Sequence, residues 1–375
     1  MLTTRPRWGY SADTEILTSH GWMTLSQLTY ASEVATRTPD GRFEWQHPER
    51  VTFQPYEDDM VWFHSRTTDL LVAPDQRVLY HVRQRDCRGG KRIELAPKEC
   101  ITLARGLVGR SVALVATSRW EPADPKRDIA FTANVACSYG GRLAKRPKGF
   151  AVSATHFAAF MGMFLAEGYL GPPVGGNYPI YVTQSQKGKG FSAYQELLNC
   201  MLNREVPWRS ASGGSWCFYN KALYEYLATC GKYAWGKRIP REVLDLPTND
   251  LGTFWFYYWL GDGSLMASPG RKDIEVGQTT SKEMADGFQE VLQKLGGWSI
   301  VHTVIEKPRG DVCGRPVITR HTLYRVVRRA GNVAFATKIE NVSYKGTIGR
   351  IIVPNGTVYV RRNDHPVWSV TPAGC

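Results

Sequence analysis

The sequence predicts an α+β protein in which a repeated α/β segment interrupts an all-β domain. Three observations support this prediction. Short segments rich in β-branched and aromatic residues occupy both ends of the chain, longer segments with helical spacing occupy the middle, and the middle is internally repeated. A chain of 375 residues exceeds the size at which one hydrophobic core keeps growing, so two or three domains are expected.

The two ends of the chain read as strands and turns. The strand-like segments are 14–18, 51–53, 60–64, 70–72 and 77–82 near the start, and 339–344, 349–353 and 357–361 near the end. A Pro-Asp-Gly turn at 39–41 and an Asn-Gly hairpin signal at 355–356 separate some of them. We therefore expect 1–125 and 338–375 to be two parts of one β domain.

The middle of the chain reads as helices that alternate with strands. Segments with helical length and spacing are 153–168, 192–202, 221–230, 250–261 and 282–295. A stretch rich in Gly, Pro and Lys precedes the first of them, which predicts a basic linker over 126–149. The α/β domain is then expected over 150–305.

Positive charge is the main compositional signal. Lys and Arg number 47 against 34 Asp and Glu, which gives a formal net charge of +13. Basic residues concentrate in 83–110, 119–148 and 307–329 among aromatic residues, which favours a nucleic-acid surface over an anionic membrane or a solvated face. The sequence shows no signal segment and no apolar run long enough to span a bilayer comfortably. The eight cysteines form no CxxC pair, so we expect a cytoplasmic protein without a zinc site.

Two nine-residue segments, 160–168 and 255–263, have the same form: each reads as a helix that ends in an acid followed by glycine. A strand containing glutamine follows each acid, after 17 and 16 residues respectively. The paired residues are Glu167 and Asp262 in the helices, and Gln184 and Gln278 in the strands. This order recurs after about 95 residues, which predicts two halves related by a pseudo-two-fold axis.

Small residues recur every four positions on the first of these helices, at Ala158, Gly162 and Ala166, so a second helix can approach it closely. Pairing of the two helices would bring Glu167 and Asp262 together. Adjacent carboxylates at helix C-termini repel each other unless a cation is present, and hard oxygen ligands suit Mg²⁺. The alternative is that each acid-glycine pair only terminates a helix, which two equivalent pairs make the weaker interpretation.

Segments 160–168 and 255–263 resemble the two motifs of single-chain LAGLIDADG homing endonucleases, and Lys237-Arg-Ile-Pro before the second motif is also typical of that family. The resemblance covers about residues 150–305, with a departure at Tyr257, where a small residue usually stands. It implies a monomer with two αββαββα halves that binds duplex DNA. Residues 306–337 would then be a basic connector or DNA-contacting strands.

The resemblance also implies roles for individual residues. Glu167 and Asp262 would bind Mg²⁺ and activate water for in-line attack on a phosphodiester. Gln184 and Gln278 would order waters near the scissile phosphates, the alternative being polar strand residues that face solvent or read bases. The candidates for a basic catalytic residue are Lys187, Lys282 and Lys307.

The flanking segments resemble the Hint domain of inteins, with 13–22, 70–79 and 353–363 similar to its sequence blocks. Splicing needs a Cys or Ser nucleophile, a Thr-x-x-His and a terminal Asn. The matching positions hold Gly9 (or Ser11 nearby), Ala73 and Gln76, and 367–375 contains neither His nor Asn. We therefore expect a Hint-like domain that does not splice and that serves as an accessory DNA-binding or stabilising module.

Three functions are compatible with these features. We expect a site-specific, Mg²⁺-dependent DNA endonuclease of a bacterial or phage-infected cell. A second candidate is a DNA- or RNA-binding protein on the same fold that does not cleave, like a maturase or a repressor. A third is an autoprocessing intein, which the missing nucleophile and histidine argue against. Retention of both Glu167 and Asp262 favours the nuclease.

Overall fold

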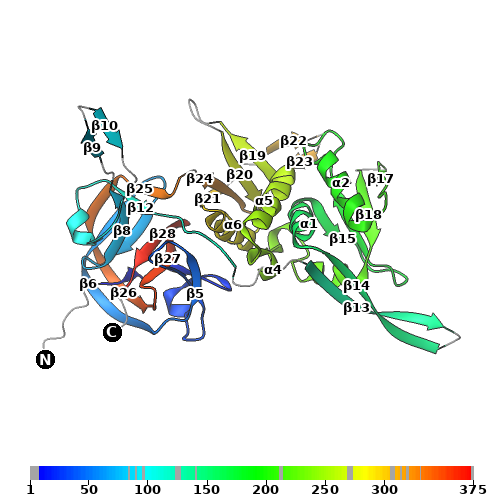
Figure 1. Cartoon of the computed structure of the whole chain (residues 1–375), viewed down its shortest axis with the longest axis horizontal. Helices are drawn as coiled ribbons and strands as arrows, with labels where there is room; N and C mark the ends of the chain where they lie inside the picture. Colours follow the sequence, from blue (N-terminus) through cyan, green and yellow to red (C-terminus); the bar gives the residue numbers. More distant parts are fainter. Residues whose placement is uncertain are drawn as a thin grey trace. The chain divides into compact units, whose positions relative to one another are not determined.

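The chain is an α+β protein, as the sequence predicts (Figure 1). The computed structural model describes residues 8–82, 85–88, 91–94, 98–122, 128–139, 142–210, 214–267, 273–304, 309–312, 315–317, 321–329 and 331–372. Two compact units divide it. The β unit consists of 1–121, 292–301 and 328–375, and the α/β unit consists of 122–291 and 302–327. One boundary lies between β12 (Val112–Val115) and β13 (Asp128–Tyr139), and the other three lie within α6 (Lys282–Lys294), β21 (Trp298–Val304) and β24 (Leu323–Arg329).

The β unit is built from short strands and two long ones. Its N-terminal elements are β1 (Tyr10–Ser11), β2 (Glu15–Thr18), β3 (Gly21–Thr24), η1 (Leu25–Gln27), β4 (Val34–Arg37), β5 (Phe43–Gln46), β6 (Arg50–His64), β7 (Asp69–Val72), β8 (Arg77–Val82), β9 (Arg85–Arg88), β10 (Lys91–Glu94), β11 (Lys98–Leu103), η2 (Ala104–Leu107) and β12 (Val112–Val115). Its C-terminal strands are β25 (Val333–Ala336), β26 (Lys338–Ile352), β27 (Thr357–Arg362) and β28 (His365–Val370).

Strands from the two ends of the chain share the sheets of the β unit. β1, β26, β6 and β7 close a barrel, in which β6 and β26 pair without interruption from Arg50↔Ile352 to His64↔Lys338. A second sheet has the order β25-β12-β8-β28-β27-β2-β4-β5. Buried apolar and aromatic side chains fill the interior, among them Tyr10, Val61 and Trp368. The alternation of β-branched residues therefore produces half-buried strands at both ends, and neither end completes the sheets alone.

The α/β unit contains two similar halves. The first comprises α1 (Ala154–Glu167), β15 (Gly168–Leu170), β16 (Pro179–Thr183), α2 (Phe191–Leu202), β17 (Trp208–Arg209), β18 (Ser215–Tyr219) and α3 (Lys221–Ala228). After η3 (Ala234–Gly236) and α4 (Arg241–Leu244), the second comprises α5 (Thr248–Asp262), β19 (Gly263–Met266), β20 (Ile274–Thr279), α6 (Lys282–Lys294), β21 (Trp298–Val304), β22 (Arg309–Val312), β23 (Arg315–Val317) and β24 (Leu323–Arg329).

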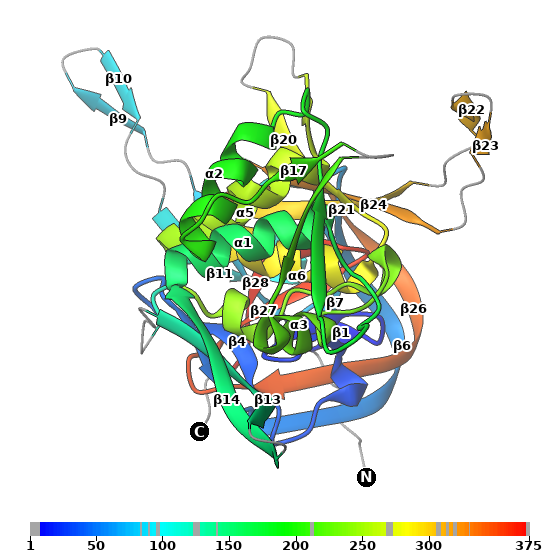
Figure 2. The ribbon, with the colours of Figure 1, turned by 90° about the vertical axis from the view of Figure 1, so that its right-hand side faces the viewer.

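The two halves have the same sheet topology. The first sheet has the order β15-β16-β18-β17 and the second has the order β19-β20-β24-β21. In each, the strand that follows the acid-bearing helix is at one edge, and its neighbour carries or precedes the predicted glutamine. α1 and α5 lie side by side between these elements (Figure 2). The internal repeat of the sequence is thus a repeat of structure.

One segment differs from its expected structure, and a second takes the strand form that was one of its two expectations. Where a basic linker is predicted over 126–149, β13 (Asp128–Tyr139) and β14 (Arg142–Ser153) pair along their whole length as a hairpin. The hairpin is held on the helices by Phe131, whose ring packs against Phe157 at 5.7 Å and Tyr226 at 4.2 Å. Within 306–337, β24 pairs with β20 in the second sheet and β25 pairs with β12 in the β unit. Charge composition does not distinguish a linker from a hairpin, and the pairings of β24 and β25 depend on strands distant in the sequence.

Candidate functional site

The site is built on the contact between α1 and α5. A Cβ atom added to Gly162 would overlap the carbonyl oxygen of Phe254, and one added to Gly261 would lie 2.6 Å from the Cβ of Ala166. The small residues predicted to allow close approach therefore line the contact. The bulky Tyr257 fits because Gly162 faces its Cβ, while its ring stacks on Tyr194 with centroids 6.2 Å apart. On the side of Tyr257, the helix contact thus pairs a glycine with a bulky residue instead of pairing two small residues.

Both helices end at the predicted acid. α1 ends with Glu167 and α5 ends with Asp262. Each helix is followed directly by a strand whose first residue is glycine. Gly168 and Gly263 are extended (φ −93° for both), so neither is the left-handed glycine that commonly terminates a helix. Both are needed for space, because a Cβ there would collide with Phe164 or Trp259. The acid-glycine pairs therefore do more than end a helix: they place the acids where a helix meets a sheet.

The two carboxylates interact electrostatically. Burial, followed by the negative charge of Glu167, raises the pKa of Asp262 to about 7, and nearby lysines only partly oppose this. Burial likewise raises the pKa of Glu167, against the charge of Lys237 and a hydrogen bond from Gln184. Asp262 nevertheless reaches solvent. A cation bound between the two carboxylates would relieve their repulsion.

Lys237 lies beneath the acids and is almost fully buried. Its Nζ donates hydrogen bonds to the carbonyl oxygens of Phe164 (3.1 Å), Leu165 (2.9 Å) and Gly168 (2.8 Å). The Phe164 carbonyl also accepts from the amide of Gly168, whereas the Leu165 carbonyl lies in the last turn of α1, beyond which no helical amide follows. Burial lowers the pKa of Lys237 to about 8, although Asp262 and Glu167 both favour its charged form. Lys237 therefore fixes the end of the helix that carries Glu167.

A second lysine reaches the other acid. The Nζ of Lys189 donates to the carbonyl oxygen of Gly263 (2.5 Å) and lies 3.8 Å from the ring centroid of Trp259. Burial lowers the pKa of Lys189, while the charge of Asp262 opposes that change. Two ammonium groups and two carboxylates are thus gathered at the helix ends.

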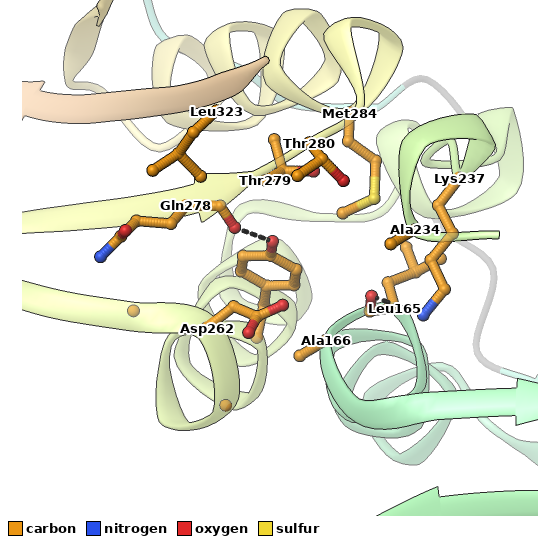
Figure 3. A pocket seen from close by; sticks show the side chains of 13 residues that line it. Leu165, Ala166, Ala234, Lys237, Asp262, Gln278, Thr279, Thr280, Met284 and Leu323 are labelled. Carbon is orange, nitrogen blue, oxygen red and sulfur yellow. Dashed lines mark hydrogen bonds between the residues drawn. The ribbon is translucent and has the colours of Figure 1, made fainter. Parts of the chain in front are cut away.

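The predicted glutamines are placed differently from each other. The Nε2 of Gln184 lies 3.4 Å from the Oε1 of Glu167, at the acid. The Nε2 of Gln278 donates instead to the Oγ of Ser264 at 3.0 Å, and its amide points away from Asp262 (Figure 3). The structure therefore brings together Glu167, Asp262 and Gln184, and it leaves Gln278 at the rim.

The three predicted basic candidates lie elsewhere. Lys187 is exposed on the loop after β16. The Nζ of Lys282 is 2.6 Å from the Oδ1 of Asp286 on the same helix. Lys307 lies outside the described residues. Within the described ranges, the lysines whose charge acts on the acids are Lys189 and Lys237. The sequence signal for them is the Lys237-Arg-Ile-Pro stretch, which gives no indication of burial.

A recess of about 450 Å³ opens beside Asp262 (Figure 3). Its walls include Lys237, Tyr258, Gln278, Ala234 and Leu323. The hydroxyl of Tyr258 donates to the backbone oxygen of Gln278 at 2.6 Å, which ties α5 to β20 at the floor. Asp262 is thus accessible to a ligand from this side.

Aromatic rings stack on one another next to this recess. The ring centroids of Tyr233 and Trp235 are 4.6 Å apart, and those of Trp235 and His321 are 4.1 Å apart. Tyr233 is 51% exposed and Trp235 is 48% exposed, and Ala234 between them lines the recess. We call Tyr233, Trp235 and His321 the aromatic row. Stacked rings at a surface are suited to contact with nucleobases.

The donor set fits a hard divalent cation. Glu167 and Asp262 supply two carboxylates, and a cation would relieve both their burial and the repulsion that raises the pKa of Asp262. No cluster of three or more His, Cys, Asp or Glu suited to a metal occurs in the described part of the chain. Mg²⁺ commonly binds through one or two carboxylates and completes its coordination with water and substrate phosphate oxygens, so two acids suffice.

The three positions matched to splicing residues lie together in the β unit. The amide of Ala73 donates to the carbonyl oxygen of Gly9 at 2.9 Å. The Nε2 of Gln76 donates to the hydroxyl of Tyr10 (3.2 Å) and to the carbonyl oxygen of Val370 (2.5 Å), and Gln76 is fully buried. Ser11 is also buried, with its Oγ 3.1 Å from the Oγ1 of Thr14. The Gln76 side chain thus links β1, near one end of the chain, to β28, near the other.

Paired helices that each deliver an acid to the edge of a four-stranded sheet define the class of this α/β unit. The model of the LAGLIDADG-like domain matches residues 251–339, so the chain carries a LAGLIDADG-like domain and the resemblance of its second motif is confirmed. The match runs past residue 305 and includes β24.

Other known proteins are similar to longer parts of the chain. The C-terminal section of the DNA-directed RNA polymerase subunit beta of Stigeoclonium helveticum is 22% identical over 405 aligned residues, covering 96% of this chain and 36% of the relative. This chain thus spans about a third of that relative's length. The homing endonuclease I-DmoI in complex with DNA and Ca is 14% identical with a TM-score of 0.34, over 47% of this chain and 83% of that chain. The AceL NrdHF class 3 split intein is 13% identical with a TM-score of 0.20, over 56% and 95%.

None of the helices in the described ranges combines the length and the apolar character that crossing a bilayer requires.

Proposed function

We propose that the chain is a metal-dependent DNA endonuclease. The observation that carries this proposal is the pair Glu167 and Asp262 at the ends of two packed helices, with Asp262 lining an open recess. Burial raises the pKa of both acids, and the charge of Glu167 raises that of Asp262 further. Repelling carboxylates destabilise a fold, so their presence at equivalent places of a repeat favours a role that uses the charge. The LAGLIDADG-like match and the net charge of +13 support DNA as the substrate.

The residues of the site take separate parts in this proposal. Glu167 and Asp262 hold Mg²⁺, which, when bound, supplies Lewis-acid stabilisation of phosphate oxygens and a more acidic water. Lys237 keeps the end of α1 in place through its three carbonyl contacts. Lys189, beside Asp262, supplies a positive charge toward a phosphate. Gln184 orients the Glu167 carboxylate from the neighbouring strand.

The β unit is, in our proposal, a Hint-like module that no longer splices. The positions of a nucleophile and of the polarising Thr and His hold Gly9, Ala73 and Gln76. The side-chain amide of Gln76 donates buried hydrogen bonds to Tyr10 and Val370, so it stabilises the fold by linking β1 to β28. The module thus serves stability or accessory DNA binding.

Cleavage by the full chain tests the nuclease. A library of supercoiled plasmids with randomised duplex inserts would be incubated with Mg²⁺ and with wild type, Glu167→Gln or Asp262→Asn, with the exposed Glu205→Gln as the matched control. Linear product from wild type and the control, and at least a 100-fold loss in either acid variant, support the proposal. Tight binding of a selected duplex without any strand break in Mg²⁺ or Mn²⁺ would contradict it and would favour the non-cleaving DNA- or RNA-binding protein.

A further inference from the structure

The β6/β26 ribbon of the β unit carries an unusual set of side chains at one end. Thr52 pairs with Arg350 and Arg50 pairs with Ile352, so all four project from the same face. Arg50 and Arg350 are therefore diagonal neighbours on that face. Like charges in this arrangement repel each other, which makes the pair unfavourable unless something of opposite charge lies against it.

Neither guanidinium has a carboxylate partner among the residues that the structure describes. Arg350 donates through Nη2 to the Oε1 of Gln54 at 2.8 Å, and its guanidinium carbon lies 5.3 Å from the ring centroid of Trp8. Burial and the positive charge of Arg50 lower the pKa of Arg350. The two arginines thus face each other with only neutral groups beside them.

Buried donors are also left without acceptors here. Within the described ranges, the Nε of Arg350 and the Nε2 of Gln54 are both buried and have no hydrogen-bond partner. Leaving such a donor unpaired is unfavourable, and more so when the group is charged. Gln54 continues the same face of β6, next to Thr52. A ligand at this place would therefore have to supply hydrogen-bond acceptors.

A small cavity lies at this place. Trp8, Arg50, Thr52, Arg350 and Ile352 line a volume of about 150 Å³. That volume equals roughly five water molecules in the liquid, which is room for a compact oxyanion. Gly9 helps to form it, since a Cβ there would lie 3.0 Å from the Cγ of Arg350 and 2.9 Å from the oxygen of Gly349.

We propose that Trp8, Arg50, Thr52 and Arg350 form an oxyanion site on the β unit that takes a phosphate group. Phosphate oxygens accept charge-assisted hydrogen bonds from guanidinium groups, and a hydroxyl such as that of Thr52 adds a neutral donor. The anion separates the two arginines and supplies acceptors to the unpaired donors. The phosphate comes either from a nucleic-acid backbone or from free phosphate. The site belongs to the β unit, whereas the acids belong to the α/β unit, and it does not depend on the proposed nuclease activity.

Calorimetric titration of the full chain tests the site. Inorganic phosphate would be titrated at constant ionic strength into wild type, Arg50→Gln and Arg350→Gln, with Arg110→Gln as the control because Arg110 is an exposed arginine of the same unit. We expect wild type and Arg110→Gln to bind alike, and the affinity of Arg50→Gln and Arg350→Gln to fall at least about tenfold. Arg50 is exposed, so Arg50→Gln decides the result if Arg350→Gln fails to fold.

A second titration separates the sources of the phosphate. A short duplex of arbitrary sequence, followed over a range of salt concentrations without Mg²⁺, should bind Arg50→Gln more weakly and with a salt slope smaller by about one if the site contacts the DNA backbone. A loss confined to inorganic phosphate assigns the site to the free anion. Equal phosphate affinity in all four proteins, or no phosphate binding by wild type, would overturn the proposal.

Discussion

Gly162 and Phe254 touch through their backbones, with no room for a side chain on Gly162 between α1 and α5. The contact lies five residues before Glu167 and eight before Asp262 along their helices. Because an α-helix rises about 1.5 Å per residue, an error in helix separation at this point is carried to both acids. The distance between the two carboxylates is therefore determined in the middle of the helix pair.

Substitution of Gly162 by alanine should separate the helices. We expect a loss of about 2–4 kcal/mol in the free energy of unfolding, because the added methyl group meets backbone that cannot move aside easily. Chemical denaturation would measure it. Gly236→Ala is the matched control, since a Cβ there has no atom within 4 Å and its φ is not positive. Equal stability of the two variants would contradict the close helix contact.

Asp262→Asn should change the pH dependence of stability. The folded pKa of about 7 lies above that of an unfolded aspartate, so the native state binds the proton more tightly. Wild type should therefore lose stability as pH rises from about 4 to about 7 and change little above that. The advantage of Asp262→Asn over wild type should grow across the same range in the absence of metal. Melting curves would check this, and an advantage independent of pH would rule it out. The control variant Glu205→Gln should have no advantage over wild type that grows across this pH range.

Lys237→Met should destabilise the end of α1. The substitution removes the donor for the carbonyls of Phe164, Leu165 and Gly168, for which we expect a cost of about 2–3 kcal/mol. It also removes a charge that lowers the pKa of both acids. Their titration, followed by NMR of labelled carboxyl groups, should move to higher pH. Lys232→Met, on an exposed lysine nearby, should leave both measurements unchanged.

Gly9→Cys should not restore splicing. Gly9 has φ +141°, and its added Cβ would lie 2.9 Å from the carbonyl oxygen of Gly349. We expect a loss of about 1–3 kcal/mol and no shortened product in mass spectra of the incubated protein. Gly21→Cys shares a positive φ but has open space, so a smaller loss there would identify the collision as the cause. Any cleaved or ligated species would show that position 9 tolerates the nucleophile.

Trp235→Ala should weaken DNA binding without a comparable effect on folding. Trp235 is 48% exposed in the aromatic row beside the recess, and stacking on a base contributes about 1–3 kcal/mol. Fluorescence anisotropy with labelled duplex and single-stranded DNA would measure the change. Tyr30→Ala removes an exposed aromatic residue of the β unit and serves as the control. Equal affinities of both variants and wild type would exclude the aromatic row from the DNA surface.

Local patterns were sufficient to predict the acids but not their surroundings. The ends of α1 and α5 follow from helical spacing and from glycine after Glu167 and Asp262, all within a few residues. Lys237 could not be predicted at the site, because its burial depends on packing of the segment before α4 against the end of α1. The different placement of Gln184 and Gln278 likewise depends on Ser264, an acceptor that only one half provides. Sequence repeats predict equivalent backbones more reliably than equivalent side-chain partners.

The long pairing of β6 with β26 has a consequence for synthesis of the chain. Glu57 and Lys345 face each other across this ribbon, yet 288 positions separate them in the sequence. On the ribosome, β6 emerges first and then lacks its partner while most of the α/β unit is made, because domains fold largely in the order of translation. Pairings of such high sequence separation form slowly, and an unpaired strand edge is prone to association with other chains. The β unit should therefore be the last part to mature and the part most dependent on chaperones.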